Sequence, residues 1–306
     1  MDERDPLLNR LRPIAIPEGC VKPHARSGHR SVANQSALYV FGGYHGDGHK
    51  LFREIWKFDV HREEWECIQC SGDGPTSVAS SSVVMSGDVI ITFGGSGVPF
   101  GYSNSNEIHL LSIKSHHWSR LQCSGNVPES QYGTSAALTR YGQIVLFGGT
   151  SGSLFNADVH ILDLRTKSYK EVKAMGAPKP RYRHEVVWDD DRFYTIGGCT
   201  LREDFPFDII HSFEYDTMTW HQHHCSPAMS DGFPSPRRFH SCAKYGDNVY
   251  MCGGTTFLDH IYNDVWRLDL TTFQWTKMWQ TLPTPVFFPT VQLSLQLDVF
   301  MYLVGA

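Results

Sequence analysis

Five repeats of about 50 residues predict an all-β protein, a β-propeller with five complete four-stranded blades and a partial sixth. Each repeat contains an apolar run that ends in a double glycine, at residues 42–43, 94–95, 148–149, 197–198 and 253–254. An alternating run such as "REIWKFDV" follows, and an aromatic residue lies 20 to 23 residues beyond the second glycine. Strands with turn glycines at this period are typical of propeller blades.

The repeated residues have structural explanations. A strand that ends in Gly-Gly can turn sharply with positive φ and lets a neighbouring backbone approach closely. The glycines are Gly42, Gly43, Gly94, Gly95, Gly148, Gly149, Gly197, Gly198, Gly253 and Gly254. The repeated aromatics, which we expect to pack between blades, are Trp65, Trp118, Tyr169, Trp220 and Trp275. Asp59, Asp163 and Asp269, each six residues before its aromatic, are typical turn formers.

The repeats divide the chain in order. We expect residues 1–10 to be a flexible N-terminus and residues 11–306 to form a single domain. The five predicted blades are 24–75, 76–128, 129–178, 179–234 and 235–282. A propeller must close, and residues 283–306 resemble only the first two strands of another blade. We therefore expect a sixth blade that residues 283–306 share with residues 11–17.

Composition narrows the class of partner. The formal net charge is −5, from 27 basic and 32 acidic side chains that are intermixed along the chain. No global positive field therefore favours nucleic acid or an anionic membrane. The first residues lack an apolar stretch of signal-peptide length, so we expect the eight cysteines to be reduced inside the cell. The expected location is the cytoplasm, with the nucleus as a second one.

An arginine recurs in the loop that enters the innermost strand. Counting back 13 residues from the first glycine of each pair gives His29, Ser81, Ser135, His184 and His240. Three residues earlier lie Arg26, Val78, Tyr132, Arg181 and Arg237. Equivalent positions in a ring converge on the mouth of the central channel. We therefore expect these arginines to share one face of the propeller.

Further side chains are expected on the same face. Arg183 and Arg238 lie beside the repeated arginines, and Tyr44 and Tyr102 lie in loops that follow a double glycine. Together with Tyr132, these residues predict a concave binding site with guanidinium groups and a wall of aromatic side chains. A guanidinium group can hold a carboxylate with two parallel hydrogen bonds. The alternative is that the Arg-x-x-His pattern only braces each repeat.

The chain resembles the kelch-repeat family over roughly residues 24–280, on the double glycines and the following aromatics. The strings "ARSGHR", "FGGSGVPFGYSNSNEIH", "RYRHEV", "RRFHSC" and "TFQWTKM" are similar to a group of kelch propellers that are substrate receptors of cullin-2 ubiquitin ligases. The resemblance implies binding of the C-terminal tails of other proteins that end in glycine or alanine. It implies that arginines on the open face hold the terminal carboxylate, here Arg181, Arg183, Arg237 and Arg238.

In this group a helical box after the last blade binds elongin B/C and cullin-2. The residues after Trp275 alternate like strands, so we expect recognition of tails without that box in this chain. The competing interpretation is a general kelch scaffold that binds an internal loop of a signalling or cytoskeletal partner. A dependence on a free C-terminus would separate the two.

An enzyme is disfavoured. The sequence contains no nucleophile elbow, phosphate loop or dinucleotide fingerprint. Cys67 and Cys70 have metal-type spacing, but no second such pair exists, and strand alternation turns the two thiols to opposite faces. The histidines of "HQHHC", residues 221–225, are expected at a solvated outer edge. We expect no catalytic residues, no metal and no cofactor.

Overall fold

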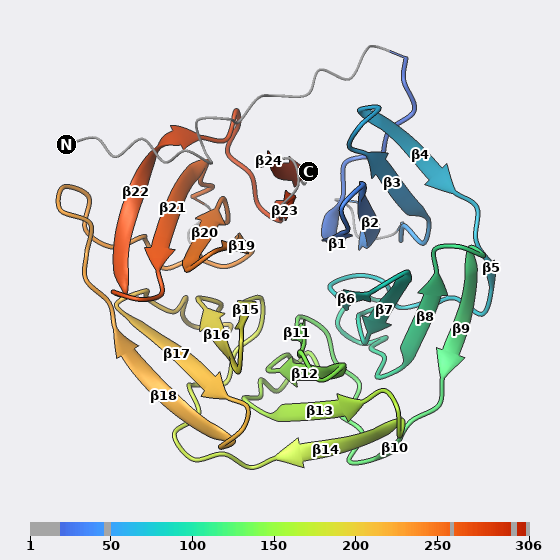
Figure 1. The fold of residues 1–306 in the computed structure, drawn as a ribbon, viewed down its shortest axis with the longest axis horizontal. Helices are drawn as coiled ribbons and strands as arrows, with labels where there is room; N and C mark the ends of the chain where they lie inside the picture. Colours follow the sequence, from blue (N-terminus) through green and yellow to red (C-terminus); the bar gives the residue numbers. More distant parts are fainter. Residues whose placement is uncertain (1–18, 46–49, 258–259, 295–298, 304–306) are drawn as a thin grey trace.

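The structure, a computed structural model, describes residues 19–45, 50–257, 260–294 and 299–303. Its strands form sheets arranged radially around a central channel (Figure 1). Among the described residues no helix is long and apolar enough to cross a membrane. The predicted all-β propeller is confirmed.

Five blades each contain four antiparallel strands, which we call a to d from the channel outward. Blade 1 contains β1 (Ser27–Ala33), β2 (Ala37–Tyr44), β3 (Ile55–Asp59) and β4 (Glu64–Ile68). Blade 2 contains β6 (Ser82–Ser86), β7 (Val89–Phe93), β8 (Ile108–Ser112) and β9 (His117–Leu121). Blade 3 contains β11 (Ser135–Leu138), β12 (Gln143–Phe147), β13 (Val159–Asp163) and β14 (Ser168–Val172). Blade 4 contains β15 (Glu185–Asp189), β16 (Arg192–Ile196), β17 (Ile209–Glu214) and β18 (Thr219–His224). Blade 5 contains β19 (Ser241–Tyr245), β20 (Asn248–Cys252), β21 (Asp264–Asp269) and β22 (Gln274–Thr281).

The double glycines lie at the ends of the b strands because two backbones meet there. Gly42 has φ of +73°, and a Cβ on it would lie 2.3 Å from the carbonyl oxygen of Val78. The next amide, of Gly43, donates a 3.0 Å hydrogen bond to that same carbonyl. Val78 precedes the inner strand of blade 2, so this contact joins neighbouring blades. A side chain at Gly42 would force the blades apart.

The repeated aromatics lie in the outermost strands, and all except Trp65 pack against the preceding blade. Trp118 of β9 contacts Phe41 of blade 1, with ring centroids 5.6 Å apart. Trp275 of β22 is fully buried, and its indole N–H donates a 2.9 Å hydrogen bond to the carbonyl of Phe207 in blade 4. Trp65 of β4 is only partly buried, in a cluster of blade 1 residues alone.

Two short strands extend the blades in a way that the sequence did not suggest. β5 (Ser71–Gly72) and β10 (Ser124–Gly125) belong to the connections that leave blades 1 and 2. Each pairs in parallel with the outermost strand of the following blade, β5 with β9 and β10 with β14. These connections tie successive blades together at the outer rim.

The turns between strands c and d follow the expected chemistry. A carboxylate oxygen of Asp59 accepts hydrogen bonds from the amides of His61 and Arg62, at 3.0 and 3.1 Å. Asp163 and Asp269 make the same pair of contacts in blades 3 and 5. These aspartates therefore shape turns.

The last two strands close the ring. β23 (Thr290–Ser294) and β24 (Val299–Leu303) form an antiparallel pair. β23 packs against the inner strands of both blade 5 and blade 1, β19 and β1, and so completes a circle of six inner strands (Figure 1). The expected contribution of residues 11–17 lies outside the described residues.

Candidate functional site

The connections that enter the inner strands and the loops between strands b and c share one face, as the sequence predicted. Isolated backbone bridges join the two sets of segments in successive blades: Ala79 with Ser96, Tyr132 with Thr150, Tyr182 with Cys199, and Arg238 with Thr255. We call this the loop face.

Three of the expected arginines are buried braces of the loop face. In Arg26, Arg181 and Arg237, Nε donates to the carbonyl two residues earlier, at 3.0, 3.1 and 3.0 Å. Their Nη1 atoms donate to the carbonyls of Gly42, Gly197 and Gly253, the first glycines of the pairs. Each guanidinium therefore ties the incoming connection to the end of strand b.

Aromatic and acidic partners complete these braces. The three guanidinium groups stack on Phe52, Phe205 and Tyr262, at 4.2, 4.3 and 3.7 Å from the ring centroids. Glu54 and Asp264 accept hydrogen bonds from Arg26 and Arg237. Burial lowers the pKa of Arg181 to about 10. The contacts of these three arginines are those of the bracing alternative, and their expected role in ligand binding stays a prediction.

In the third repeat, the residue predicted to be equivalent to the repeated arginine was wrong by one position. The amide of Gly95 bonds the carbonyl of Gln131, as that of Gly149 bonds the carbonyl of Arg181. Gln131 and Thr134, rather than Tyr132 and Ser135, are therefore the equivalents of Arg181 and His184. The connection from β11 to β12 contains an extra residue, with φ of +72° at Gly142, and this shifted the count.

Two residues after the arginine position, the backbone is left-handed in every blade. The residues concerned, with φ between 54° and 66°, are Gly28, Ser80, Gly133, Arg183, Phe239 and Phe288. This conformation is unfavourable for residues other than glycine, yet four of the six residues are not glycine. We call these six residues the mouth ring, because they enter the inner strands around the channel.

Arg183 lies in an aromatic box at the mouth ring. Its guanidinium carbon is 3.9 Å from the ring centroid of Phe239, 4.9 Å from that of Tyr182 and 5.1 Å from that of Phe288. Its Nε and Nη1 atoms are buried and have no hydrogen-bond partner among the described residues. Aromatic faces attract the cation but do not satisfy its N–H groups. Arg183 therefore keeps unused donors.

Arg238 lies next to this box. Its Nε donates to the carboxylate of Asp204 at 2.6 Å, and its Nη2 is buried without a partner in the described part of the chain. Burial raises the pKa of the Cys199 thiol to about 12, and the positive charges of Arg238 and Arg183 oppose that rise. Arg238 directly precedes Phe239, whose ring lies against the guanidinium group of Arg183, so the two arginines are neighbours on the loop face.

The expected aromatic wall exists in part. Tyr44 contacts Phe100 at 5.3 Å between ring centroids, and Phe100 contacts Tyr132 at 4.9 Å. Tyr132 in turn contacts Tyr182 at 6.1 Å. Tyr102 is 90% exposed and lies outside this row. The structure therefore brings Tyr44 and Tyr132 together with Arg183, through Phe100 and Tyr182.

Sequence reasoning missed several residues of the site. Phe100, Tyr182, Phe239 and Phe288 surround Arg183, and Asp204 holds Arg238. The six mouth-ring residues share a backbone conformation rather than a residue type. The sequence feature that could have identified them is their constant position, two residues after the repeated arginine position.

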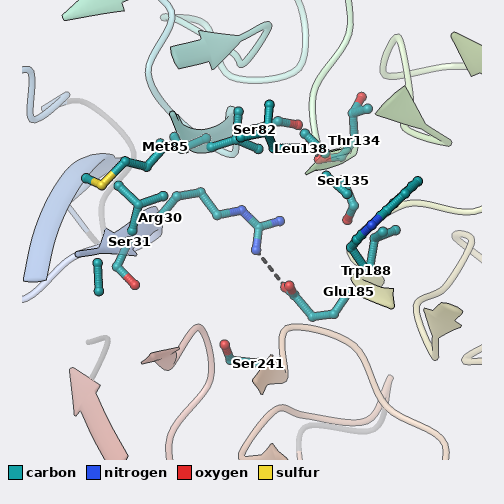
Figure 2. A pocket seen from close by; sticks show the side chains of 17 residues that line it. Arg30, Ser31, Ser82, Met85, Thr134, Ser135, Leu138, Glu185, Trp188 and Ser241 are labelled. Atoms are coloured by element: carbon teal, nitrogen blue, oxygen red, sulfur yellow. Dashed lines mark hydrogen bonds and ion pairs between the residues drawn. The ribbon is translucent and has the colours of Figure 1, made fainter. Parts of the chain in front are cut away.

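The channel behind the mouth ring contains a cavity of about 330 Å³ lined by the inner strands. Arg30 of β1 reaches into it and meets Glu185 of β15, with Nη1 2.6 Å from Oε1 (Figure 2). Ser31, Ser82 and Ser135 also line the cavity (Figure 2), and the hydroxyls of Ser82 and Ser135 donate to the carbonyls of Thr134 and His184 in the next blade, both at 2.6 Å. Its lining is mainly polar.

The repeated histidines are buried between blades. His29 and His240 have pKa values lowered to about 3, and the pKa of His184 also lies well below its usual value, in each case mainly because burial disfavours the charged form. The ring of His240 bonds the carbonyl of Ile196 in the preceding blade, at 3.2 Å. Within the described ranges, no three His, Cys, Asp or Glu side chains are grouped to hold a metal ion.

The blade repeat and its braces define a kelch-type β-propeller. The model of the KLHDC2/KLHL20/DRC7 Kelch-repeats domain matches residues 14–198 and 100–305, and the chain belongs to this family.

Individual relatives agree. The chain is 39% identical to Kelch domain-containing protein 10 of Xenopus tropicalis over 285 residues, which are 89% of this chain and 69% of the relative. It is 38% identical to Kelch domain-containing protein 10 of Homo sapiens over 293 residues, 90% of this chain and 66% of the relative. It is 27% identical to Kelch domain-containing protein 2 of Bos taurus over 267 residues, 84% of this chain and 57% of the relative. The chain thus spans about two thirds of the length of these two Kelch domain-containing protein 10 relatives.

Proposed function

We propose that this propeller is a non-catalytic recognition module that binds the C-terminal tails of other proteins at the loop face. The observation that supports it best is the pair of neighbouring arginines, Arg183 and Arg238, which keep buried N–H groups without partners among the described residues. Buried donors of charged groups are costly to leave unsatisfied. A terminal carboxylate offers two acceptor oxygens and a negative charge, which suits such donors.

The arginines differ in how freely they can serve a ligand. Arg26, Arg181 and Arg237 already use Nε and Nη1 on backbone carbonyls. In the described part of the chain, Nε and Nη1 of Arg183 have no acceptor, and Arg238 donates from Nε to Asp204. We therefore assign the carboxylate to Arg183 and Arg238, with the aromatic row as the wall. A small final residue, glycine or alanine, would fit beside these rings.

The test is a titration with tail peptides ending in Gly or Ala, each measured as the free acid and as the C-terminal amide. Amidation removes the charge and one acceptor oxygen but keeps every other contact. Tight binding of the acid and weak binding of the amide would support the proposal. Equal binding of both forms would reject it.

We extend the proposal to a role as substrate receptor with elongin B/C and cullin-2 as partners, on the family resemblance. A pull-down of the full chain with purified elongin B/C and cullin-2 tests this separately. Capture of both would support ligase recruitment, whereas a chain that binds tails but captures neither would be a recognition module alone.

A second function, a scaffold for an internal loop or folded surface of a partner, is favoured by a different observation. Exposed apolar side chains occupy the loops between strands b and c in four consecutive blades: Tyr102, Leu154, Leu201 and Phe257, at 56–90% exposure. Contiguous exposed apolar surface often marks a protein-binding site. Binding that is unaffected by amidation but lost in Leu201→Ser or Phe257→Ser would favour the scaffold.

A further inference from the structure

A small pocket of about 20 Å³ lies between the mouth ring and the channel. Ser80 and Arg183 line it from the ring, His29 and His240 from the starts of the inner strands, and Arg30 and Glu185 from the channel side. It is a different space from the larger cavity of Figure 2, although Arg30 and Glu185 border both.

The pocket is bordered by hydrogen-bond donors that the protein does not satisfy. Nε and Nη1 of Arg183 are buried and without a partner among the described residues, and so is the hydroxyl of Ser80. A guanidinium group has only donors, so it requires an acceptor. Its aromatic neighbours supply faces and no acceptor atoms.

The charges around the pocket leave an excess of one positive charge. Glu185 is paired with Arg30 at 2.6 Å, so these two groups neutralise each other. His29 and His240 are uncharged near neutral pH, because burial lowers their pKa values to about 3. Arg183 remains the unbalanced charge, in a partly buried place where water screens it poorly.

We propose that this pocket binds a small inorganic anion of the halide class, chloride in the cell, held by Nε and Nη1 of Arg183 and by the hydroxyl of Ser80. A single ion of this size matches the pocket, since about one water-sized sphere is needed for occupancy. The anion would use the same N–H groups of Arg183 to which the tail carboxylate is assigned, so the two ligands would compete for these donors, but the anion site does not rest on tail binding.

Crystals soaked in sodium bromide locate the ion through the anomalous scattering of bromine. The expected result is an anomalous peak at hydrogen-bonding distance from Arg183 and Ser80. A pocket that contains only water under these conditions overturns the proposal.

Thermal melting tests the site in solution. Melting temperatures are compared in sodium chloride and sodium gluconate at equal ionic strength, because gluconate is too large for the pocket. Chloride is expected to raise the melting temperature of the wild type in a saturable way, since a ligand that binds only the folded state stabilises it. The response is expected to vanish in Arg183→Gln and to weaken in Ser80→Ala.

Ser81→Ala is the matched control. Ser81 is the next residue, and its hydroxyl is likewise buried without a partner in the described chain, but it does not line the pocket. Ser81→Ala should keep the full chloride response. The same melting temperature in chloride and gluconate, or an unchanged response in Arg183→Gln, would contradict the anion site.

Discussion

Arg30 and Glu185 form an ion pair across the central channel, between the inner strands of blades 1 and 4. Their side chains are 25% and 17% exposed, so the pair is partly shielded from water. The pair borders both the small pocket under the mouth ring and the larger channel cavity (Figure 2). It therefore links strands that no backbone hydrogen bond joins.

Removal of one member of this pair should destabilise the propeller more than removal of both. Glu185→Gln leaves Arg30 without its acceptor, and we expect a loss of about 1–3 kcal/mol in the free energy of unfolding. Arg30→Met combined with Glu185→Gln should recover part of that loss. Urea denaturation of the two single variants and the double variant measures the coupling. Additive effects of the two substitutions would show that the pair contributes nothing.

The brace at Arg237 should be essential for stability. Arg237→Ala removes hydrogen bonds to two backbone carbonyls and leaves the largely buried carboxylate of Asp264 without its cation, with only the indole N–H of Trp266 as a donor. We expect a loss of about 3–5 kcal/mol in the free energy of unfolding. Arg202→Ala is the control, because Arg202 lies exposed in a loop of the same face. Similar stabilities of the two variants would contradict the bracing role.

Acidification should destabilise the chain before its carboxylates titrate. His29 and His240 have folded-state pKa values of about 3, below the unfolded value of about 6.5. Between these values the unfolded state binds more protons, so stability is full above pH 6.5 and is lost as the pH falls towards 3. The slope should be small near pH 7 and approach about 1.4 kcal/mol per pH unit for each histidine once the pH is well below 6.5. Free energies of unfolding measured from pH 7 to pH 5 test it, and a flat profile would show that these histidines are not buried as described.

Glycine substitutions should separate backbone strain from blade contact. Gly42→Ala combines a left-handed backbone with a Cβ 2.3 Å from the carbonyl oxygen of Val78, whereas Gly87→Ala, with φ of +56°, meets no atom within 4 Å. We expect about 1 kcal/mol of destabilisation for Gly87→Ala, from strain alone. Gly42→Ala should lose several times as much or fail to fold. Equal melting temperatures of the two variants would contradict the close approach of blades 1 and 2.

The sequence was sufficient for the architecture because the blade signals are local. Each double glycine and each aromatic recurs at a nearly constant offset, and the structure places them at the ends of strands b and in strands d. Counting back from the double glycine gave the wrong residues in the third repeat, because the hairpin before Gln143 contains one extra residue. The parallel strands β5 and β10 were missed because two exposed residues, Ser-Gly, carry no periodic pattern.

The site was less accessible to sequence reasoning. Arg181 and Arg183 lie only two residues apart in the sequence. Arg181 is buried against backbone carbonyls and the ring of Phe205, whereas Arg183 contacts aromatic rings from the connections that enter three different inner strands. The difference comes from the left-handed backbone of Arg183, which redirects its side chain. Phe288 belongs to the partial sixth blade, so its contact with Arg183 depends on closure of the ring.

The most direct test of tail recognition by Arg183 compares four affinities, those of the acid and amide forms of one peptide for the wild type and for Arg183→Gln. A tail peptide ending in alanine, as the free acid and as the amide, is titrated into the wild type and into Arg183→Gln, with Arg202→Ala as the control. One charge-assisted contact should favour the acid over the amide roughly 10- to 150-fold in the wild type and in the control. In Arg183→Gln that preference should fall towards one. A preference that is the same in Arg183→Gln and in the wild type would contradict recognition of the chain end by Arg183.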